Sequence, residues 1–389
     1  MIRSALRPRT VEERFASITM MEGAARRRIP RFIHDYMVGG IGREVAVARG
    51  RDTLDAVQLM PRYLEGGSIP DLSTMLLGQQ LGAPFGAAPV GLAGLIWPEA
   101  EHHIASAAVA QGLPVGLSSY ATATIEEIGA VAGRLMWFQL YPLRDESIEQ
   151  DLLARFAAIG GEVLIITVDI PGRTRRERDI ANGLSVPPRP GLRVFAQCAA
   201  RPAWSLATLR AGVPHFRTLA RYRSEAGDSL AGLSYDDLAA PLSPARLRRY
   251  RDLWKGRLVI KGILSPRDAE IAADCGADGI VVSNHGGRQL DAAPSALDML
   301  PEIRRAIGTR IAVLADGGAR SGLDIARMLA KGADFVLLGR VMALAVAAMG
   351  REGPAHALHV LTDELRCTLV QLGCSDHRQL PEFLYEPDA

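Results

Sequence analysis

A short string in the second half of the chain combines a histidine, a pair of glycines and an arginine. It reads SNHGGRQLD and covers residues 283–291. Consecutive glycines let the backbone turn tightly, so His285 and Arg288 can project into one pocket. Histidine suits a general base near neutral pH, and a guanidinium presents a bidentate donor fork to a carboxylate. The string therefore predicts a site where a base and a carboxylate-binding cation lie together.

Two glycine-rich segments further along have the composition of a phosphate site. DGGARSGLD covers residues 316–324, and Gly339 and Arg340 follow a later apolar run. Backbone N–H groups at glycines can donate to an anion, and arginines add positive charge. We expect Gly318, Arg320, Gly339 and Arg340 to hold a phosphate. One glycine-rich turn would be a weak signal, but the pair is a strong one.

These segments follow apolar runs that alternate with amphipathic stretches. Such alternation is typical of βα units, and runs rich in Val, Ile and Leu are typical of parallel strands covered by helices. Eight is the number of strands that a closed (β/α)8 barrel requires. The runs cover residues 84–89, 113–118, 135–141, 163–169, 257–262, 279–284, 311–316 and 335–340.

The sequence therefore predicts an α/β fold, a (β/α)8 TIM barrel in a single domain over residues 1–389. We expect a helical cap over residues 1–80 and, because the fourth connection is the longest, a long loop over residues 180–255. Function in this fold lies at the C-terminal ends of the strands. Any one polar residue there could simply mark where a strand meets a loop, but together they indicate a site. They are Ser118, Gln139, Tyr141, Thr167, Asp169, Lys261, Ser283, His285, Asp316 and Arg340.

The composition excludes several classes of protein. The formal net charge is +2, so no overall field indicates a nucleic-acid partner. The four cysteines lack CxxC spacing, which argues against a zinc site and a disulfide framework, and we expect no metal. Residues 1–20 lack the apolar core of a secretory signal, and the longest apolar run, Val341–Met349, is too short to span a membrane. We expect a cytoplasmic protein.

The string at residues 283–291 resembles the signature of the FMN-dependent 2-hydroxy acid oxidases and dehydrogenases. That family includes glycolate oxidase, lactate dehydrogenase and mandelate dehydrogenase. The resemblance extends from Asp35 and Tyr36 to the C-terminal helix and passes through ITVDIPGRTRRERD, which ends at Asp179. Thr174 stands where the family usually has glycine. The resemblance implies FMN as the cofactor and the oxidation of an L-2-hydroxy acid, mandelate-like or lactate-like, to the 2-oxo acid.

The resemblance also implies catalytic and substrate-binding roles. His285 would be the general base, and Asp169 would pair with it and stabilise its protonated form. Arg176 and Arg288 would hold the substrate carboxylate. The hydroxyls of Tyr36 and Tyr141 would donate hydrogen bonds to the substrate. Arg175 and Arg178 are the alternatives to Arg176.

For the cofactor, Lys261 resembles the family lysine beside flavin N1 and O2, where a fixed cation stabilises the anionic reduced ring. A lysine that ends a buried strand is costly unless paired, which favours this role over that of a surface lysine. The other residues expected beside the ring, the ribityl chain or the phosphate are Ala88, Pro89, Ser118, Gln139, Thr167, Ser283, Asp316, Gly318, Arg320, Gly339 and Arg340.

Two positions bear on substrate size. Gly91 lies where glycolate oxidases tend to have alanine, which leaves more room over the ring, and Tyr120 stands where they carry tryptophan. The segment around Gly91 looks most like bacterial mandelate and lactate dehydrogenases. These departures favour a bulky or aromatic 2-hydroxy acid. The alternative for Gly91 is a backbone turn that requires glycine.

The long loop contains a basic and apolar segment, residues 190–224, without any acidic residue. Such a mixture suits peripheral contact with an anionic membrane surface, where a quinone would accept the electrons. The alternative is a solvated lid over the site, with oxygen as a possible acceptor. The resemblance further implies a homotetramer. The arginines are Arg193, Arg201, Arg210, Arg217, Arg221 and Arg223, and the interleaved apolar residues are Val194, Phe195, Trp204, Leu206, Leu209 and Phe216.

Three other functions fit the sequence less well. A non-catalytic flavin-binding or structural barrel would not need a lysine, a histidine and an arginine on one face. A nicotinamide-dependent enzyme would need a GxGxxG string after a strand, but Gly40 and Gly42 are followed by Val45 and preceded by no strand. Another FMN barrel enzyme, such as a type 2 isopentenyl diphosphate isomerase, would need a diphosphate pocket in place of SNHGGRQ.

Overall fold

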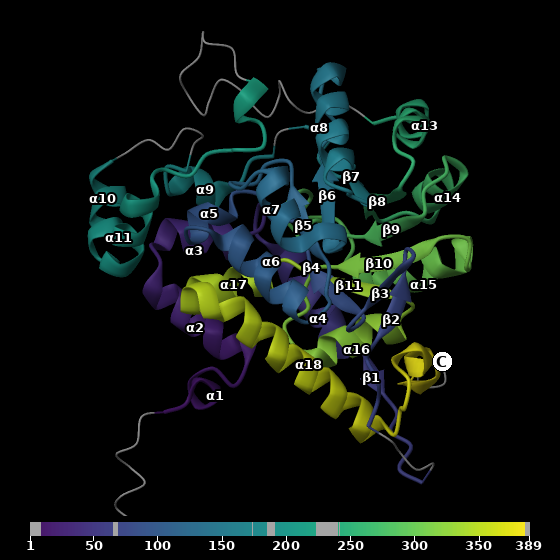
Figure 1. The fold of residues 1–389 in the computed structure, drawn as a ribbon. Helices are drawn as coiled ribbons and strands as arrows, with labels where there is room; N and C mark the ends of the chain where they lie inside the picture. The colour runs from purple at the N-terminus through teal and green to yellow at the C-terminus, as the bar shows by residue number, and fades with distance from the viewer. Residues whose placement is uncertain are drawn as a thin grey trace, which may run out of the picture.

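Eight parallel strands close into a barrel at the centre of the molecule (Figure 1). The computed structural model describes residues 9–64, 69–172, 174–184, 191–222, 240 and 242–385. The ring follows chain order, and β11 closes it by pairing with β4. The predicted (β/α)8 architecture is confirmed. The strands are β4 (Phe85–Ala87), β5 (Val115–Ser118), β6 (Met136–Leu140), β7 (Val163–Thr167), β8 (Arg257–Ile263), β9 (Gly279–Val282), β10 (Ala312–Asp316) and β11 (Phe335–Leu338).

Each strand lies within the run predicted for it or differs from it by a residue at the end. The largest difference is at β4, where only Phe85–Ala87 of the predicted residues 84–89 is strand. Pro84 and Pro89 flank it, and a proline has no N–H to donate to a ladder. The shortening leaves Ala88 and Pro89 in the turn at the C-terminal end.

Large apolar side chains fill the inside of the barrel. Trp137 and Phe335 pack at a ring separation of 5.8 Å, and both are fully buried. A β-hairpin lies against this cluster and contributes Leu76 and Leu81 to it. Gln79 of the hairpin accepts a hydrogen bond from Trp137 Nε1 at 2.9 Å, so the indole N–H is satisfied although it is buried. The barrel is thus a packed core with its chemistry confined to one end.

Helices cover the outside of the barrel. Most of them begin at a Ser, Thr or Asp whose side chain accepts a backbone N–H of the first turn, as Ser265, Ser295 and Ser321 do. The helices are α6 (Ala100–Ala110), α7 (Ile125–Ala132), η2 (Gly133–Leu135), α8 (Glu146–Ala158), α13 (Pro244–Leu253), α14 (Pro266–Asp274), α15 (Ala296–Ile307), α16 (Gly322–Ala330), α17 (Arg340–Met349), η4 (Gly350–Glu352) and α18 (Gly353–Leu372).

The segment before the barrel is helical only in its first part. Short strands follow its helices. Leu76 and Leu81 on these strands pack into the cluster inside the barrel, so this part of the chain does not form an amphipathic helix. The antiparallel pair β1 and β12 joins this segment to the C-terminal end of the chain. The elements of this segment are α1 (Val11–Arg14), α2 (Ile18–Arg28), α3 (Arg31–Val38), α4 (Val45–Ala56), β1 (Gln58–Leu59), β2 (Thr74–Leu76) and β3 (Gln79–Leu81). The short helix α5 (Ala93–Ile96) follows β4, and η5 (His377–Phe383) and β12 (Leu384–Tyr385) follow α18.

The long connection between β7 and β8 forms a group of short helices beside α3 (Figure 1). Trp204 anchors this group, because its indole N–H donates to the carbonyl of Ile96 at 3.1 Å and its ring packs on Phe32. Within the described ranges, no helix is long and apolar enough to cross a membrane. The group comprises α9 (Glu177–Ala181), α10 (Leu192–Ala199), α11 (Pro202–Ala211) and η3 (Ala220–Tyr222).

Candidate active site

A cavity of about 590 Å³ opens at the C-terminal ends of the barrel strands. It brings together residues that the sequence places far apart, from the cap to the end of β11. Arg175 does not line it, and Arg178 pairs instead with Glu44 at 2.6 Å. The predicted residues that line it are Tyr36, Ala88, Pro89, Gly91, Gln139, Tyr141, Thr167, Arg176, Lys261, His285, Arg288, Asp316, Gly318, Arg320, Gly339 and Arg340.

Three predicted residues lie behind this lining and contact it. Ser118 Oγ donates to Gln139 Oε1 at 2.8 Å, and Gln139 Nε2 donates to the Thr167 hydroxyl at 2.9 Å. Ser283 Oγ accepts from Lys261 Nζ at 3.2 Å and from the backbone N–H of His285 at 3.0 Å. Ser118 and Ser283 therefore orient residues that line the cavity. The third residue behind the lining is Asp169, which contacts His285.

The histidine and its aspartate form a pair at the cavity wall. His285 Nδ1 lies 3.0 Å from Asp169 Oδ1. His285 has a left-handed backbone (φ 56°), and Gly286 and Gly287 continue it with φ of 62° and 75°. A non-glycine residue in this region is strained, and such strain gathers at functional sites. The tight turn directs the imidazole toward β7 and the cavity together.

Glycine is required beside this pair. Gly262 has φ +103°, and a Cβ there would lie only 2.5 Å from Asp169 Cγ. Burial raises the pKa of Asp169, but the charges of His285 and Lys261 outweigh it, so the carboxyl pKa falls below its ordinary value. Asp169 Oδ2 is buried without a partner among the described residues. The aspartate is therefore an anion held against the imidazole.

A buried cation lies next to the pair. Lys261 Nζ is 2.7 Å from Asp316 Oδ2. Burial lowers the pKa of Lys261, but the charges of Asp316 and Asp169 outweigh it and the net shift is upward. In the described part of the chain, Asp316 Oδ1 is buried and has no hydrogen-bond partner. The cavity floor thus offers a fixed ammonium group and one open carboxylate oxygen.

Arginine side chains and a tyrosine surround the mouth of the cavity. Arg288 Nη1 donates to the carbonyls of Tyr36 and Gly39 at 2.7 and 2.9 Å, and its guanidinium lies 5.2 Å from the Tyr36 ring centre. Burial, with the charge of Arg176, lowers the pKa of Arg288. Arg176 Nε has no partner in the ranges that the structure describes. Two cations therefore face a space suited to an anion.

Asp179 also lines the cavity, and the sequence argument gave it no role. Burial raises the pKa of Asp179, although the nearby charges of Arg288 and Arg176 oppose the shift. It ends the RRERD string, which was the available signal. Asp179 is therefore an acid close to the charges of both arginines.

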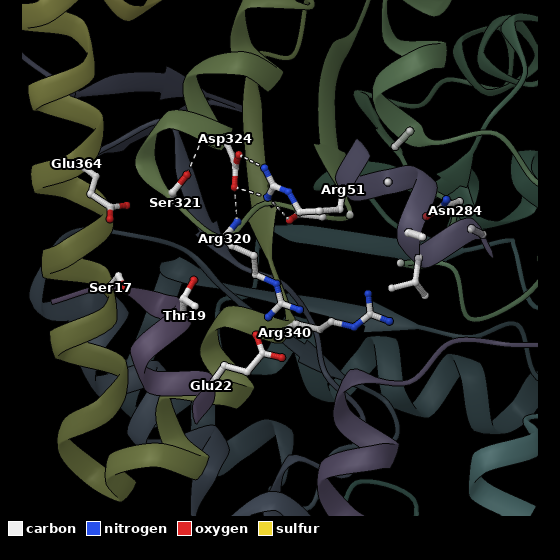
Figure 2. A pocket seen from close by; sticks show the side chains of 18 residues that line it. Ser17, Thr19, Glu22, Arg51, Asn284, Arg320, Ser321, Asp324, Arg340 and Glu364 are labelled. Atoms are coloured by element: carbon white, nitrogen blue, oxygen red, sulfur yellow. Dashed lines mark hydrogen bonds and ion pairs between the residues drawn. The ribbon is translucent and has the colours of Figure 1, made fainter. Parts of the chain in front are cut away.

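A second cavity, of about 510 Å³, adjoins the first at the ends of β10 and β11 (Figure 2). Arg320 Nη1 and Arg340 Nε are buried there without partners among the described residues. Burial lowers the pKa of Arg320, and burial together with the charges of Arg288 and Arg320 lowers the pKa of Arg340 to about 9. Arg340 Nη2 donates to the Gly39 carbonyl at 3.0 Å.

These two guanidinium groups fit the phosphate of a cofactor. Each is buried and has an unsatisfied donor, which is unfavourable unless an anion binds. The N-terminus of α16 begins immediately after Arg320 and Ser321, so its backbone dipole favours negative charge at the same place. The donor set thus agrees with the predicted phosphate site.

An apolar wall faces the arginines from the other side of the first cavity. Tyr120 packs on Tyr141 and Phe216 at ring separations of 4.9 and 5.2 Å. A Cβ at Gly91 would meet the Tyr120 Cβ at 3.5 Å, an ordinary contact, so the backbone alone does not require glycine. Sequence reasoning missed several wall residues, because packing across the barrel brings them in: Leu95, Ile96, Leu184 and Val213.

Comparison with known proteins decides the family. The model of the FMN-dependent dehydrogenase family matches residues 25–386. The chain belongs to this family. It is an FMN-dependent oxidoreductase, and FMN is the cofactor of the family. Within the described residues no group of acidic, histidine and cysteine side chains could hold a metal ion.

Individual relatives of this FMN-dependent dehydrogenase are similar over nearly their whole length. An L-lactate dehydrogenase of Caulobacter vibrioides is 43% identical over 374 residues, which is 95% of this chain and 97% of that protein. An L-lactate dehydrogenase of Ectopseudomonas mendocina is 40% identical over 371 residues, 94% of this chain and 97% of its own.

Solved structures extend the likeness to mandelate enzymes. A structure described as the monotopic membrane protein (S)-mandelate dehydrogenase is 33% identical, with a TM-score of 0.90, over 96% of this chain and 100% of that chain. A mandelate oxidase with benzoyl-formic acid is 34% identical, with a TM-score of 0.80, over 95% and 98%. The predicted class, an FMN-dependent 2-hydroxy acid dehydrogenase or oxidase, is confirmed, and the isomerase and non-catalytic alternatives are not favoured.

Proposed function

We propose that the protein oxidises an L-2-hydroxy acid with a bulky, apolar side chain to the corresponding 2-oxo acid. The observation that carries this proposal is one cavity lined by the guanidinium groups of Arg176 and Arg288 and by His285, which pairs with Asp169 behind the lining. The proposed base and the proposed carboxylate site therefore lie in the same cavity. The apolar wall completes the set of groups that such a substrate needs.

The buried polar atoms without partners indicate how the chain would hold FMN. Arg320 and Arg340 would bind its phosphate, with backbone N–H groups at Gly318 and Gly339. The open oxygen of Asp316 would accept a ribityl hydroxyl. The bound cofactor supplies an acceptor for two electrons. Lys261 places a positive charge beside it, and the residues expected to line the rest of the cofactor are Ala88, Pro89, Gln139 and Thr167.

His285 would serve as the base through Nε2, since its other ring nitrogen, Nδ1, contacts Asp169. A proton from the substrate passes to Nε2, and the imidazole becomes a cation. Asp169 would stabilise that cation, because the pKa of the Asp169 carboxyl is lowered and the group is an anion. Tyr141 lines the same cavity and would donate to the substrate oxygen.

Arg288 and Arg176 would hold the carboxylate of the substrate. Arg288 is fixed by two carbonyl groups of the cap, so part of its fork is oriented before any ligand binds. Tyr36 is oriented too, because its hydroxyl donates to the Gly91 carbonyl at 3.3 Å. Two guanidinium groups at one anion place the Cα of the substrate against the base.

The apolar wall supports a mandelate-like substrate. Tyr120, Phe216 and Leu95 offer contact area to a ring, and the missing Cβ of Gly91 leaves space. Curated relatives at 40–43% identity are L-lactate dehydrogenases, so a lactate-like substrate is the second candidate. The methyl side chain of lactate would leave much of this apolar wall without a contact.

The visible spectrum of the purified holoenzyme under anaerobic conditions tests the proposal. L-Mandelate, L-lactate and glycolate are added separately, and the rate at which the yellow flavin bleaches ranks them. We expect L-mandelate to bleach fastest, and faster bleaching by L-lactate would favour the second candidate. The His285→Ala variant should retain bound FMN and not bleach. Bleaching by none of the acids would refute the substrate class.

We further propose peripheral contact with the cytoplasmic face of a membrane, with a quinone as the electron acceptor. Leu192, Phe195 and Leu209 on α10 and α11 are 91%, 74% and 79% exposed, and Arg193 and Arg210 lie among them. Exposed apolar and basic residues together favour an anionic lipid surface. Admitting oxygen after bleaching tests the acceptor, since rapid reoxidation would favour an oxidase.

Other residues of the long segment turn inward. Trp204 is buried, Val194 packs on the core, and Phe216 lines the cavity, while Arg217 pairs with Glu127 at 2.7 Å. The membrane surface is therefore restricted to the outer side of α10 and α11, and Arg223 lies outside the described residues. We also propose a homotetramer of single-domain subunits, which light scattering of the purified protein would test.

A further inference from the structure

The cap helix α4 lies directly against the loop that carries the phosphate-binding residues. Gly318 in that loop has φ +92°, and a Cβ there would lie 2.8 Å from Leu54 Cδ1 and 2.9 Å from the Gly50 carbonyl oxygen. No larger residue fits between the helix and the loop. The position of α4 therefore fixes the position of the loop.

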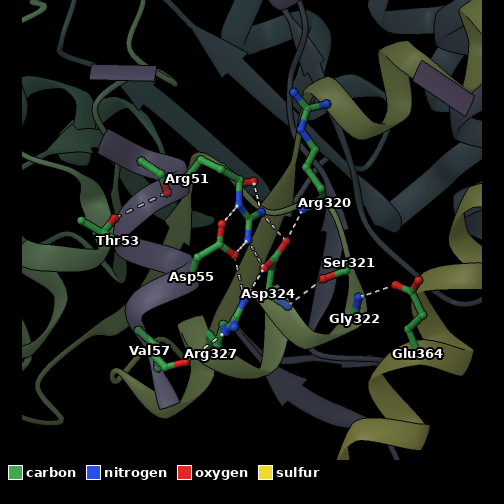
Figure 3. A network of polar contacts seen from close by, with 12 residues as sticks. Arg51, Thr53, Asp55, Val57, Arg320, Ser321, Gly322, Asp324, Arg327 and Glu364 are labelled. Carbon is green, nitrogen blue, oxygen red and sulfur yellow. Dashed lines mark hydrogen bonds and ion pairs between the residues drawn. The ribbon is translucent and has the colours of Figure 1, made fainter. Parts of the chain in front are cut away.

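A single arginine of α4 bonds this interface together (Figure 3). Arg51 Nη1 and Nη2 donate to the two oxygens of Asp324, each at 2.7 Å. Nε and Nη2 donate to Asp55 at 3.0 and 2.5 Å, and Nη1 also donates to the Gly318 carbonyl at 3.3 Å. A guanidinium has five donor hydrogens, so these contacts use all of them.

That saturation distinguishes Arg51 from the arginines that would bind phosphate. Arg320 Nη1 and Arg340 Nε are buried with no partner among the described residues, so both have a donor left for a ligand. Arg51 has none left, although its side chain lines the same cavity. It must therefore act through the loop and not on the ligand.

Asp324 passes the restraint on to Arg320. The aspartate is almost fully buried, and its Oδ2 accepts the backbone N–H of Arg320 at 2.8 Å while it also binds Arg51. From the other side, Glu364 of α18 accepts the N–H of Gly322 at 2.7 Å. The backbone around Arg320 is thus held from two directions.

We infer that Arg51 is a positioning residue for the cofactor phosphate, which it serves by holding the loop of residues 317–321 through Asp324. The inference rests on the proposed assignment of Arg320 and Arg340 to that phosphate. The cap thereby sets how tightly FMN is retained, without touching it. Riboflavin, which lacks the phosphate, should not depend on Arg51.

The test compares FMN and riboflavin affinity in the full-length apoprotein, measured by quenching of flavin fluorescence. In Arg51→Lys the charge remains but the fork is lost, and in Asp324→Asn the bridging charge is lost. We expect each variant to weaken FMN binding about tenfold to a hundredfold and to leave riboflavin binding unchanged. Wild-type FMN affinity in Arg51→Lys would overturn the inference, because charge alone would then suffice.

Two further variants separate the possible failures. Arg320→Gln tests the phosphate assignment itself. If this variant does not reduce the difference between FMN affinity and riboflavin affinity, the assignment fails. Arg304→Gln is the matched control, since Arg304 pairs with Asp334 at 2.7 Å outside both cavities and should change neither affinity. If Arg51→Lys does not fold, Asp55→Asn is the substitute variant, because it weakens the contact at the exposed side of the Arg51 guanidinium. A smaller loss of FMN affinity supports the inference, and no loss overturns it.

Discussion

Two residues with a positive φ, His285 and Gly262, lie at the contact between the proposed base and Asp169. His285 adopts a left-handed conformation that non-glycine residues avoid, and Gly262 leaves room for the Asp169 carboxylate. Both departures serve one contact, the 3.0 Å pairing of imidazole and carboxylate. The rest of the fold offsets this conformational cost, and the proposed role of His285 as base depends on the geometry that results.

Replacement of Asp169 by Asn should leave the fold intact and slow the chemical step. The amide cannot stabilise an imidazolium as the carboxylate does, so we expect flavin reduction to slow by about 10²- to 10⁴-fold. Stopped-flow absorbance under anaerobic conditions measures that rate. An unchanged rate would contradict the role of the aspartate, and an unchanged flavin content serves as the control.

Replacement of Gly262 by Ala should displace the same aspartate by a different route. The added methyl would lie 2.5 Å from the Asp169 Cγ in a backbone conformation with φ +103°. We expect both a lower melting temperature and a slower flavin reduction. Gly133→Ala is the matched control: it also has a positive φ, at 51°, but its Cβ would meet nothing within 4 Å. It should lower the melting temperature and not slow reduction.

At the scale of elements, α10 and α11 have two different faces. One face packs against α3 and α5 through Trp204, whereas the other exposes large apolar residues. The helices thus join the surface that we propose to contact a membrane to a segment that lines the first cavity through Phe216. A loop that served only as a solvated lid would not need this exposed apolar surface.

The double variant Phe195→Gln/Leu209→Gln should detach the protein from lipid. Each change removes a side chain that would enter the acyl boundary, so we expect at least about a tenfold lower partition onto anionic vesicles. Co-sedimentation with vesicles measures it, and added salt should weaken what binding remains. Met75→Gln on the hairpin, where the side chain is 63% exposed, is the control. Equal binding of double variant and wild type would refute the membrane surface.

At the scale of the whole molecule, the two adjoining cavities gather positive charge. Arg288, Arg320 and Arg340 are all buried there, and burial lowers the pKa of each. A cation whose pKa is lowered on folding destabilises the folded state at every pH at which it stays protonated. The ligand-free protein therefore carries a penalty that bound anions remove.

FMN should accordingly raise the melting temperature of the apoprotein by several degrees, because a ligand that binds only the folded state stabilises it. Arg340→Met, which removes one buried charge, should melt higher than wild-type apoprotein and gain less from FMN. Thermal melts of both proteins with and without FMN measure these differences. A variant that melts lower than wild-type apoprotein would show that Arg340 is not a source of strain.

Much of this arrangement could be predicted from the sequence because strand ends are local signals. A run such as residues 335–340 carries its own apolar core, its glycine and its arginine, so both strand and site follow from neighbours in the chain. Arg51 offered no such signal, since its partner Asp324 lies 273 positions away. Asp291 is similar: it accepts the backbone N–H of Arg43, just before α4, and that of Ala46 in the first turn of α4. Contacts of this kind depend on packing, which one sequence does not encode locally.

A single backbone oxygen joins the two ends of the active site. The Gly39 carbonyl accepts Arg288 at 2.9 Å and Arg340 at 3.0 Å, and no side chain fits at Gly39 because a Cβ would lie 2.5 Å from the Asp35 carbonyl. Arg288 of the proposed carboxylate site and Arg340 of the proposed phosphate site thus share one acceptor, so an anion bound at either arginine changes the charge felt at the other. We expect hydroxy acid and FMN to be thermodynamically linked ligands, and each then alters the affinity of the other by the same factor.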